Sequence, residues 1–171
     1  MEEPAAPVRP VPPRIAVVGE RVASPTHRDA AWAVGREIAL RGGVLICGGM
    51  GGVMEAASEG CASAGGLVVG ILPGEHAAEA NPCVAIPVAT GMGEARNAII
   101  ARTGEAMIAI GGSYGTLSEI AFALHFGVPV IGIDTWQLEA PGVKVDPVLR
   151  VSSAAEAVEK ALGLVRSRRS T

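Results

Sequence analysis

A glycine-rich segment, GGSYGTLSE at residues 111–119, combines residue types that could bind an anion and act on it. It follows the apolar run AMIAI, which indicates a turn from a strand into a helix. Glycine lets the backbone approach a ligand closely, and free N–H groups at a helix start attract negative charge. A second segment of this kind, CGGMGGVME, spans residues 47–55. Two such turns in one small chain predict a site for phosphate or another anionic group.

The residues expected to bind this ligand lie in the two turns, at the end of the first apolar run, or just after an upstream arginine. They are Gly19, Gly48, Gly49, Gly51, Gly52, Asn97, Gly112, Ser113, Tyr114, Gly115 and Thr116. Tyr114 is placed either to stack on a base or to lie at the rim of the turn. Asn97 suits either a hydrogen bond to the ligand or a turn cap.

Glu119 has two interpretations. Its spacing from Thr116 is typical of a capping box, in which the two side chains satisfy backbone N–H groups at a helix start. The alternative is a carboxylate that acts at the anion site. Arg96 is the candidate partner, because the chain between it and Glu119 holds one helix, one strand and one turn. Both side chains could therefore reach the same cleft.

The familiar nucleotide-binding loops do not fit this sequence. A P-loop requires Gly-Lys, which occurs nowhere in the chain, and the first apolar run is followed by ERVASPTH instead of a dinucleotide fingerprint. The three histidines lack metal-ligand spacing, and the three cysteines match no zinc pattern. We therefore expect no metal site. The cysteines are expected to be buried free thiols; they are Cys47, Cys61 and Cys83.

Short apolar runs alternate with helical patterns along the chain. Strands are predicted at residues 14–19, 44–47, 67–73, 83–90, 106–112 and 128–134, and helices at residues 27–43, 51–66, 93–104 and 115–127. A last strand and helix follow, with a capping box at Ser153 and Glu156. Strands that are apolar throughout indicate a sheet covered on both faces. The predicted fold class is therefore α/β, a single doubly wound, mainly parallel, Rossmann-like sheet.

Composition limits the partners. Hydrophobic residues make up 49% of the 171 residues and the net charge is −3, so a nucleic-acid partner is not expected. The basic cluster Arg166–Arg169 is expected to be a solvated helix end. No apolar run approaches the ~20 residues of a membrane span, and the acidic, proline-rich start is no secretory signal. We expect a cytoplasmic protein with a disordered or polyproline-like tail at residues 1–13 and one domain at residues 14–171.

Residues 35–73 and 94–134 resemble the LOG-like superfamily, whose members were often labelled possible lysine decarboxylases. It includes cytokinin riboside 5′-monophosphate phosphoribohydrolases and molybdenum cofactor carrier proteins. The resemblance covers about residues 14–134, and implies a Rossmann-like fold and usually a homodimer. In the hydrolases, a Pro-Gly-Gly-x-Gly-Thr-x-x-Glu loop holds phosphate and supplies an acidic residue. The chain matches it at Gly112, Gly115, Thr116 and Glu119, and matches the upstream catalytic arginine at Arg96.

The chain departs from the hydrolase pattern at Gly111, Ser113 and Asn97, which stand for a proline, a glycine and a lysine. In this it is more similar to the carrier-like bacterial branch. The resemblance implies that the chain binds a phosphorylated nucleotide-type ligand. It also implies two alternatives: hydrolysis of the N-glycosidic bond of nucleoside 5′-monophosphates by Arg96 and Glu119, or a non-catalytic carrier of molybdenum cofactor or nucleotide sensor.

The historical decarboxylase label does not suit the residues. That chemistry normally uses pyridoxal phosphate on a Schiff-base lysine, and neither Lys144 nor Lys160 lies near a glycine-rich turn. No cofactor is expected to be required, and a phosphorylated nucleotide or molybdenum cofactor is expected only as a ligand.

Overall fold

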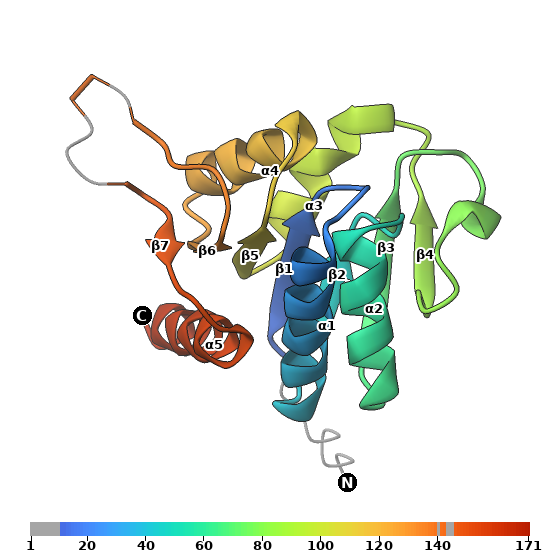
Figure 1. The fold of residues 1–171 in the computed structure, drawn as a ribbon, viewed down its shortest axis with the longest axis horizontal. Coiled ribbons are helices and arrows are strands. Elements are labelled where there is room, and N and C mark those ends of the chain that lie inside the picture. Colours follow the sequence, from blue (N-terminus) through green and yellow to red (C-terminus); the bar gives the residue numbers. More distant parts are fainter. Residues whose placement is uncertain (1–10, 140, 143–145) are drawn as a thin grey trace, which may run out of the picture.

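The computed structural model describes residues 11–139, 141–142 and 146–171 of the chain, in which strands and helices alternate (Figure 1). The strands are β1 (Arg14–Gly19), β2 (Val44–Cys47), β3 (Leu67–Leu72), β4 (Ile86–Ala89), β5 (Ala106–Ile110), β6 (Val130–Ile133) and β7 (Leu149–Arg150). The helices are α1 (Pro25–Leu40), α2 (Val53–Ser63), α3 (Asn97–Thr103), α4 (Tyr114–His125) and α5 (Ala154–Arg169). Two short 3-10 helices are η1 (Ala77–Glu79) and η2 (Gly93–Arg96).

The seven strands form one sheet in the order β4-β3-β2-β1-β5-β6-β7, and every neighbouring pair is parallel. The predicted fold class is therefore confirmed. From β1 the chain moves outward through β2, β3 and β4, then returns to place β5 on the other side of β1. The crevice between the carboxyl ends of β1 and β5 is thus the point where the strand order reverses, which is where ligands bind in such sheets.

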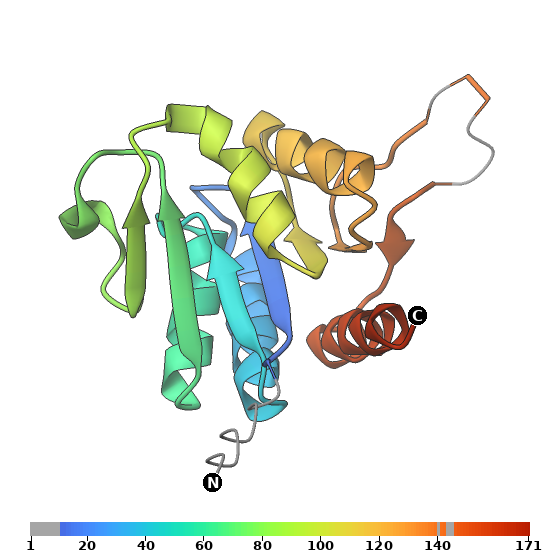
Figure 2. The same cartoon turned by 180° about the vertical axis from the view of Figure 1, so that it is seen from behind.

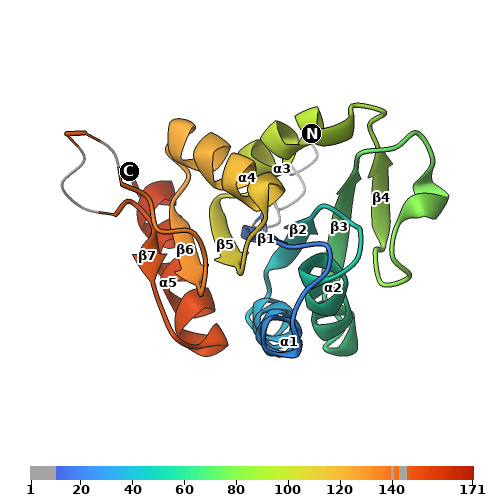
Figure 3. The same cartoon turned by 45° about the horizontal axis from the view of Figure 1, so that its top comes forward.

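Helices cover both faces of the sheet. Helices α1, α2 and α5 pack on one face of the sheet, and α3 and α4 pack on the other (Figure 3). Figure 2 shows the view of Figure 1 from behind. Along β5, Ile108 and Ile110 enter the core on the first face, while Met107 and Ala109 enter the core on the second. All four side chains are fully buried, which explains why the strand is apolar at every position.

Local signals account for several element boundaries. Ser24 caps α1 by accepting the N–H of His27 at 3.2 Å, and Ser153 caps α5 by accepting the N–H of Glu156 at 3.2 Å. The helix predicted at residues 93–104 is divided into η2 and α3. Residues 74–82, for which no strand or helix is predicted, contain η1.

The basic last turn of α5 is exposed to solvent, as expected. Arg169 forms an ion pair with Glu105 at 2.6 Å and donates to the carbonyl oxygen of Val11 at 2.7 Å. The exposed Arg169 side chain therefore also fastens α5 to the start of β5 and to the segment before β1. Of the predicted tail, residues 1–10 lie outside the described residues, and residues 11–13 are in neither a helix nor a strand.

All three cysteines are free thiols. Cys47 and Cys61 are buried as expected, whereas Cys83 is partly exposed, so the prediction of burial is wrong for that residue. Across the described ranges, the structure has no helix with the length and apolar character needed to cross a membrane.

Candidate functional site

A cavity of about 490 Å³ opens at the carboxyl ends of β1 and β5. This volume lies in the range typical of small-molecule sites. Four sheet-to-helix connections contribute to its wall. The lining residues are Gly19, Arg21, Met50, Met54, Pro73, Glu94, Arg96, Asn97, Ser113, Tyr114, Gly115, Thr116, Ser118 and Glu119.

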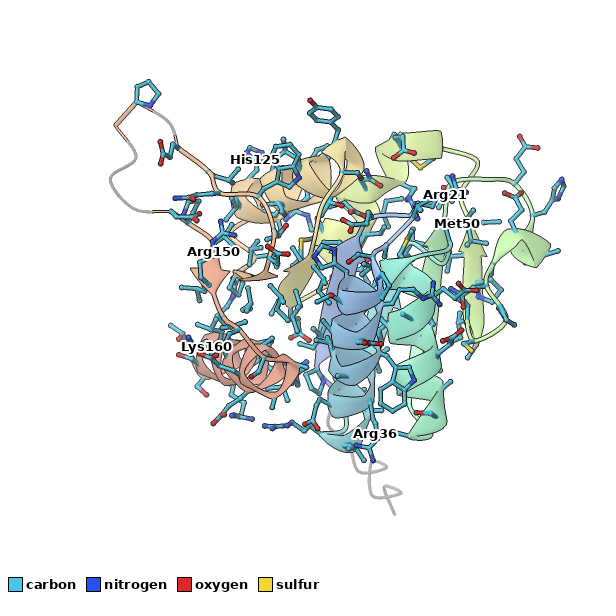
Figure 4. The ribbon with its side chains drawn as sticks, in the orientation of Figure 1. Arg21, Arg36, Met50, His125, Arg150 and Lys160 are labelled. Carbon is cyan, nitrogen blue, oxygen red and sulfur yellow. The ribbon has the colours of Figure 1, made fainter. Side chains whose placement is uncertain are left out.

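Eight of the residues singled out in the sequence meet at this cavity, namely Gly19, Arg96, Asn97, Ser113, Tyr114, Gly115, Thr116 and Glu119. Sequence reasoning missed the other six. Two of these are Arg21 and Met50, which Figure 4 labels. Arg21 follows β1 and Met50 lies within a glycine-rich turn, so their positions at carboxyl ends of strands were the available signal.

The glycines of the second turn do not form the cavity wall. Gly52 has a φ of +66°, and a Cβ there would lie 2.2 Å from the carbonyl oxygen of Glu20. The Val53 N–H, at the start of α2, already donates to that oxygen at 3.0 Å. The β1–α1 loop therefore occupies the first amide of this helix, and the expected role of the turn in anion binding stays a prediction. The predicted glycines outside the lining are Gly48, Gly49, Gly51, Gly52 and Gly112.

The start of α4 offers a narrower anion site than expected. The Gly112 N–H donates to the Glu20 carboxylate, and the Ser113 N–H donates to Thr116 Oγ1 at 3.3 Å. The amides of Tyr114 and Gly115 have no acceptor among the described residues. These two amides, at the first turn of a twelve-residue helix, are the groups free to meet an anion.

Glu119 does not cap a helix. Helix α4 begins at Tyr114, so its capping box is formed by Ser113 and Thr116, and Glu119 lies one turn further along. Its side chain is buried, with 6% exposed, and it makes no hydrogen bond or ion pair to any residue that the structure describes. Burial raises the pKa of Glu119 to about 8, against the opposing effect of the Arg96 charge. The capping interpretation is therefore wrong, and the carboxyl group is mostly protonated at neutral pH.

Arg96 is buried beside the β2–α2 turn, with 5% of the residue exposed. Its Nη1 donates to the carbonyl oxygens of Gly48, at 2.7 Å, and of Ile71, and its Nε is buried without an acceptor in the described part of the chain. Burial lowers the pKa of Arg96, and the nearby charge of Glu119 opposes that shift. A guanidinium stays charged at neutral pH despite such a shift, so Arg96 brings a fixed positive charge to the cavity.

Asn97 joins the two helices that border the cavity. Its side-chain amide donates to Ser118 Oγ at 2.8 Å and to Glu94 Oε2 at 3.3 Å. Ser118 Oγ in turn donates to the Gly115 carbonyl oxygen at 2.7 Å. Asn97 thus ties α3 to the first turns of α4 while lining the cavity.

An aromatic pair lies at the cavity rim. Tyr114 is 82% exposed, and its ring centroid lies 5.7 Å from that of Trp136. The Trp136 indole N–H donates to the Ser113 carbonyl oxygen at 3.0 Å, which fixes this ring beside the start of α4. An exposed ring next to free amides suits a ligand that carries both a flat ring and an anionic group.

A second polar cluster borders the first turn. His27 lies between two carboxylates, with Nδ1 2.5 Å from Glu20 Oε1 and Nε2 2.8 Å from Asp134 Oδ2. The hydrogen bond with Asp134, helped by Glu20, raises the pKa of His27 against the effect of burial. This cluster holds the Glu20 carboxylate against the Gly112 amide. Over the described ranges, no group of three or more His, Cys, Asp or Glu side chains could hold a metal ion.

Comparisons with known proteins agree with this geometry. The structure superposes on the molybdenum cofactor binding protein of Rippkaea orientalis with a TM-score of 0.80 and 37% identity, covering 93% of this chain and 98% of that one. For the molybdenum cofactor carrier protein of Chlamydomonas reinhardtii the TM-score is 0.82, with 32% identity over 91% and 99% of the two chains. A cytokinin riboside 5′-monophosphate phosphoribohydrolase of Oryza sativa is 34% identical over 99 residues, which span 56% of this chain and only 40% of the rice protein.

The family assignment covers most of the chain. Residues 12–161 match the SLOG cluster4 family, and this range includes every strand of the sheet and every residue that lines the cavity. Together with the parallel sheet and the LOG-like loop at the start of α4, this match shows that the chain belongs to the SLOG cluster4 family of the LOG-like superfamily.

Proposed function

We propose that the chain binds a phosphorylated nucleotide-type ligand in this cavity and hydrolyses the N-glycosidic bond of a nucleoside 5′-monophosphate. The observation that carries the proposal is Glu119, a buried carboxyl group without a protein partner in the described chain, in a cavity that also holds free backbone amides. Burial of such a group disfavours its charged form, which is the cause of its raised pKa. A ligand in the cavity would supply a hydrogen-bond partner for this carboxyl group.

The proposed reaction uses the protonation state of Glu119. With a pKa of about 8, the carboxyl group is mostly protonated at neutral pH and can act as a general acid. As the bond between the sugar C1′ and the base nitrogen breaks, the electron pair leaves with the base, which takes the Glu119 proton. The resulting carboxylate stabilises the oxocarbenium-like sugar and then takes a proton from the attacking water, whose oxygen bonds to C1′. Arg96 contributes a fixed positive charge nearby, and the base is proposed to stack on Tyr114.

A non-catalytic carrier is the second candidate. Both structural neighbours bind or carry molybdenum cofactor, and Asn97 stands where the hydrolase pattern has a lysine. The Asn97 side chain is a neutral amide that donates hydrogen bonds to Ser118 and Glu94, so it cannot replace the positive charge of that lysine. In this alternative, the same anion site and aromatic rim would shelter a phosphorylated cofactor as cargo.

Two measurements separate these functions. Chromatography after incubation with AMP and the other nucleoside 5′-monophosphates should detect free base. Glu119→Gln should abolish its release, whereas Glu59→Gln, at an exposed glutamate of α2, should not. Native mass spectrometry of freshly purified protein reports retained ligand and subunit number, and so also tests the implied homodimer.

The outcomes are distinct. No base from any monophosphate, with a phosphorylated cofactor retained on the protein, would overturn the hydrolase and support the carrier. Neither base release nor binding of any phosphorylated compound would overturn both.

A further inference from the structure

We infer that Arg21 is the side chain that binds the ligand phosphate and makes the site selective for phosphate-bearing compounds. This inference rests on the proposed binding of a phosphorylated ligand and names the residue that recognises it. Arg21 lies on the connection between β1 and α1. It is therefore not part of the glycine-rich loop at the start of α4, which ends with Glu119.

Arg96, the other cation of the cavity, is poorly placed for this task. Its Nη1 is engaged by the carbonyl oxygens of Gly48 and Ile71, and the residue is only 5% exposed. A Cβ at Gly48 would lie 2.6 Å from Nη1 and 2.9 Å from Nη2, so the guanidinium lies close against the β2–α2 turn. Bidentate binding of phosphate requires a guanidinium edge with free donors. In Arg96, Nη1 is already committed to the fold and Nε is buried, so neither edge of the guanidinium offers two accessible donors.

Arg21 has the opposite properties. It lines the same cavity, it is exposed, and its side chain forms no hydrogen bond or ion pair with any residue in the described ranges. Its backbone, in contrast, is held by packing, since the neighbouring Glu20 carbonyl accepts the Val53 N–H at 3.0 Å. The missing side chain at Gly52 is what allows this close approach, because a Cβ there would lie 2.6 Å from the Arg21 carbonyl carbon. The structure therefore fixes the base of this arginine and leaves its donors available.

The charges of the cavity favour an anion beside Arg21. Of its lining residues, Arg21 and Arg96 are positive at neutral pH, Glu94 is negative, and Glu119 is mostly neutral because burial raises its pKa to about 8. The Arg21 charge also lowers the pKa of Arg96, so the two cations repel one another across the site. A phosphate group between them would remove this repulsion. It would also meet the free amides of α4.

The neighbouring Glu20 limits where that phosphate can lie. Its carboxylate accepts the Gly112 N–H and is held by His27 at 2.5 Å. A phosphate is therefore excluded from the Gly112 amide and directed toward the amides of Tyr114 and Gly115. These two residues line the same cavity as Arg21.

The test compares ligands that differ only in phosphate. Calorimetric titrations would measure the affinity of the protein for each nucleoside 5′-monophosphate, the matching nucleoside, and ribose 5-phosphate. The variants are Arg21→Gln and Arg21→Lys. The matched control is Arg36→Gln, which removes the same charge from an exposed position on α1 far from the cavity (Figure 4). Thermal melting of each variant checks that the fold is kept.

We expect Arg21→Gln to lower the affinity for phosphate-bearing ligands by at least about tenfold, which is the effect of losing one charge-assisted contact. Affinity for the nucleoside should not change, Arg21→Lys should recover part of the loss, and Arg36→Gln should behave as the wild type. Equal affinity of wild type and Arg21→Gln for a bound phosphate compound would overturn this inference alone. If the wild type binds none of the phosphate compounds, the proposed function fails together with it.

Discussion

Arg96 and Glu119 line one cavity without forming an ion pair: among the described residues, Arg96 donates to two backbone carbonyl oxygens and Glu119 has no partner. Burial is the main cause of the pKa shift of each group, and the charge of the other group opposes that shift. This separation gives them different tasks. Arg96 fixes the wall of the cavity and supplies charge, while Glu119 is a carboxyl group free to exchange a proton with a ligand.

Glu119→Gln should stabilise the protein at alkaline pH. The pKa of Glu119 rises from 4.5 to about 8 on folding, so between these values the folded state binds a proton that the unfolded state has lost. Stability therefore falls as pH rises through this window, and glutamine removes the effect. Urea unfolding should show the variant roughly 2–4 kcal/mol more stable at pH 8 and nearly equal to the wild type below pH 5. A stability difference that does not depend on pH would contradict the raised pKa.

Arg96→Ala should destabilise the fold as well as the site. It leaves the carbonyl oxygens of Gly48 and Ile71 without their donor and creates a space beside the β2–α2 turn. We expect a loss of about 2–4 kcal/mol in the free energy of unfolding. Arg96→Lys should lose less, because it retains a charged donor. Unchanged unfolding of Arg96→Ala would show that this side chain serves only the ligand.

Gly52→Ala should impair ligand binding through the β1–α1 loop, because its Cβ would clash with the Glu20 carbonyl oxygen at 2.2 Å and displace Arg21. Gly65→Ala is the matched control, since its φ of +73° is similar but no atom lies within 4 Å of its Cβ. Backbone strain adds to the cost at both positions, and Gly52, with φ +66° and ψ −126°, has a conformation that suits glycine. We expect Gly52→Ala to cost more stability in urea unfolding and to reduce phosphate-ligand affinity, with affinity intact in Gly65→Ala. Equal effects of the two substitutions would contradict the loop contact.

His27→Gln should be destabilising at acidic pH only. Hydrogen bonds to Asp134 and Glu20 raise the folded-state pKa of His27 above 6.5, so its contribution is complete below that value and is lost as pH rises through the raised pKa. Asp134 is largely exposed, so we expect only about 1 kcal/mol at pH 5.5. Unfolding measured at pH 5.5 and 8.5 tests this, with His125→Gln as a control outside the cluster. A larger effect at pH 8.5 would reverse the predicted sign.

The local pattern of the sequence was sufficient for the elements but not for their ends. Runs such as AMIAI indicate buried strands, because a short segment that is apolar at every position suits a strand covered on both faces. The spacing of Thr116 and Glu119 is typical of a capping box, whereas Ser113 and Thr116 form the box of α4. Both pairs have the same three-residue spacing, so sequence alone could not choose between them. The choice depends on where β5 ends and on the packing of α4 against the sheet.

The sequence by itself determined the parallel α/β fold, the glycine-rich start of α4 and the family to which the chain belongs, because these depend on local patterns and short motifs. Only the tertiary structure decided which side chains serve the site. Arg96 reaches a carbonyl oxygen 48 positions earlier, and Glu20 reaches an amide 92 positions later. Arg21 gains its place in the cavity from the packing of the β1–α1 loop on Gly52. Such contacts arise only when strands distant in sequence become neighbours in the sheet.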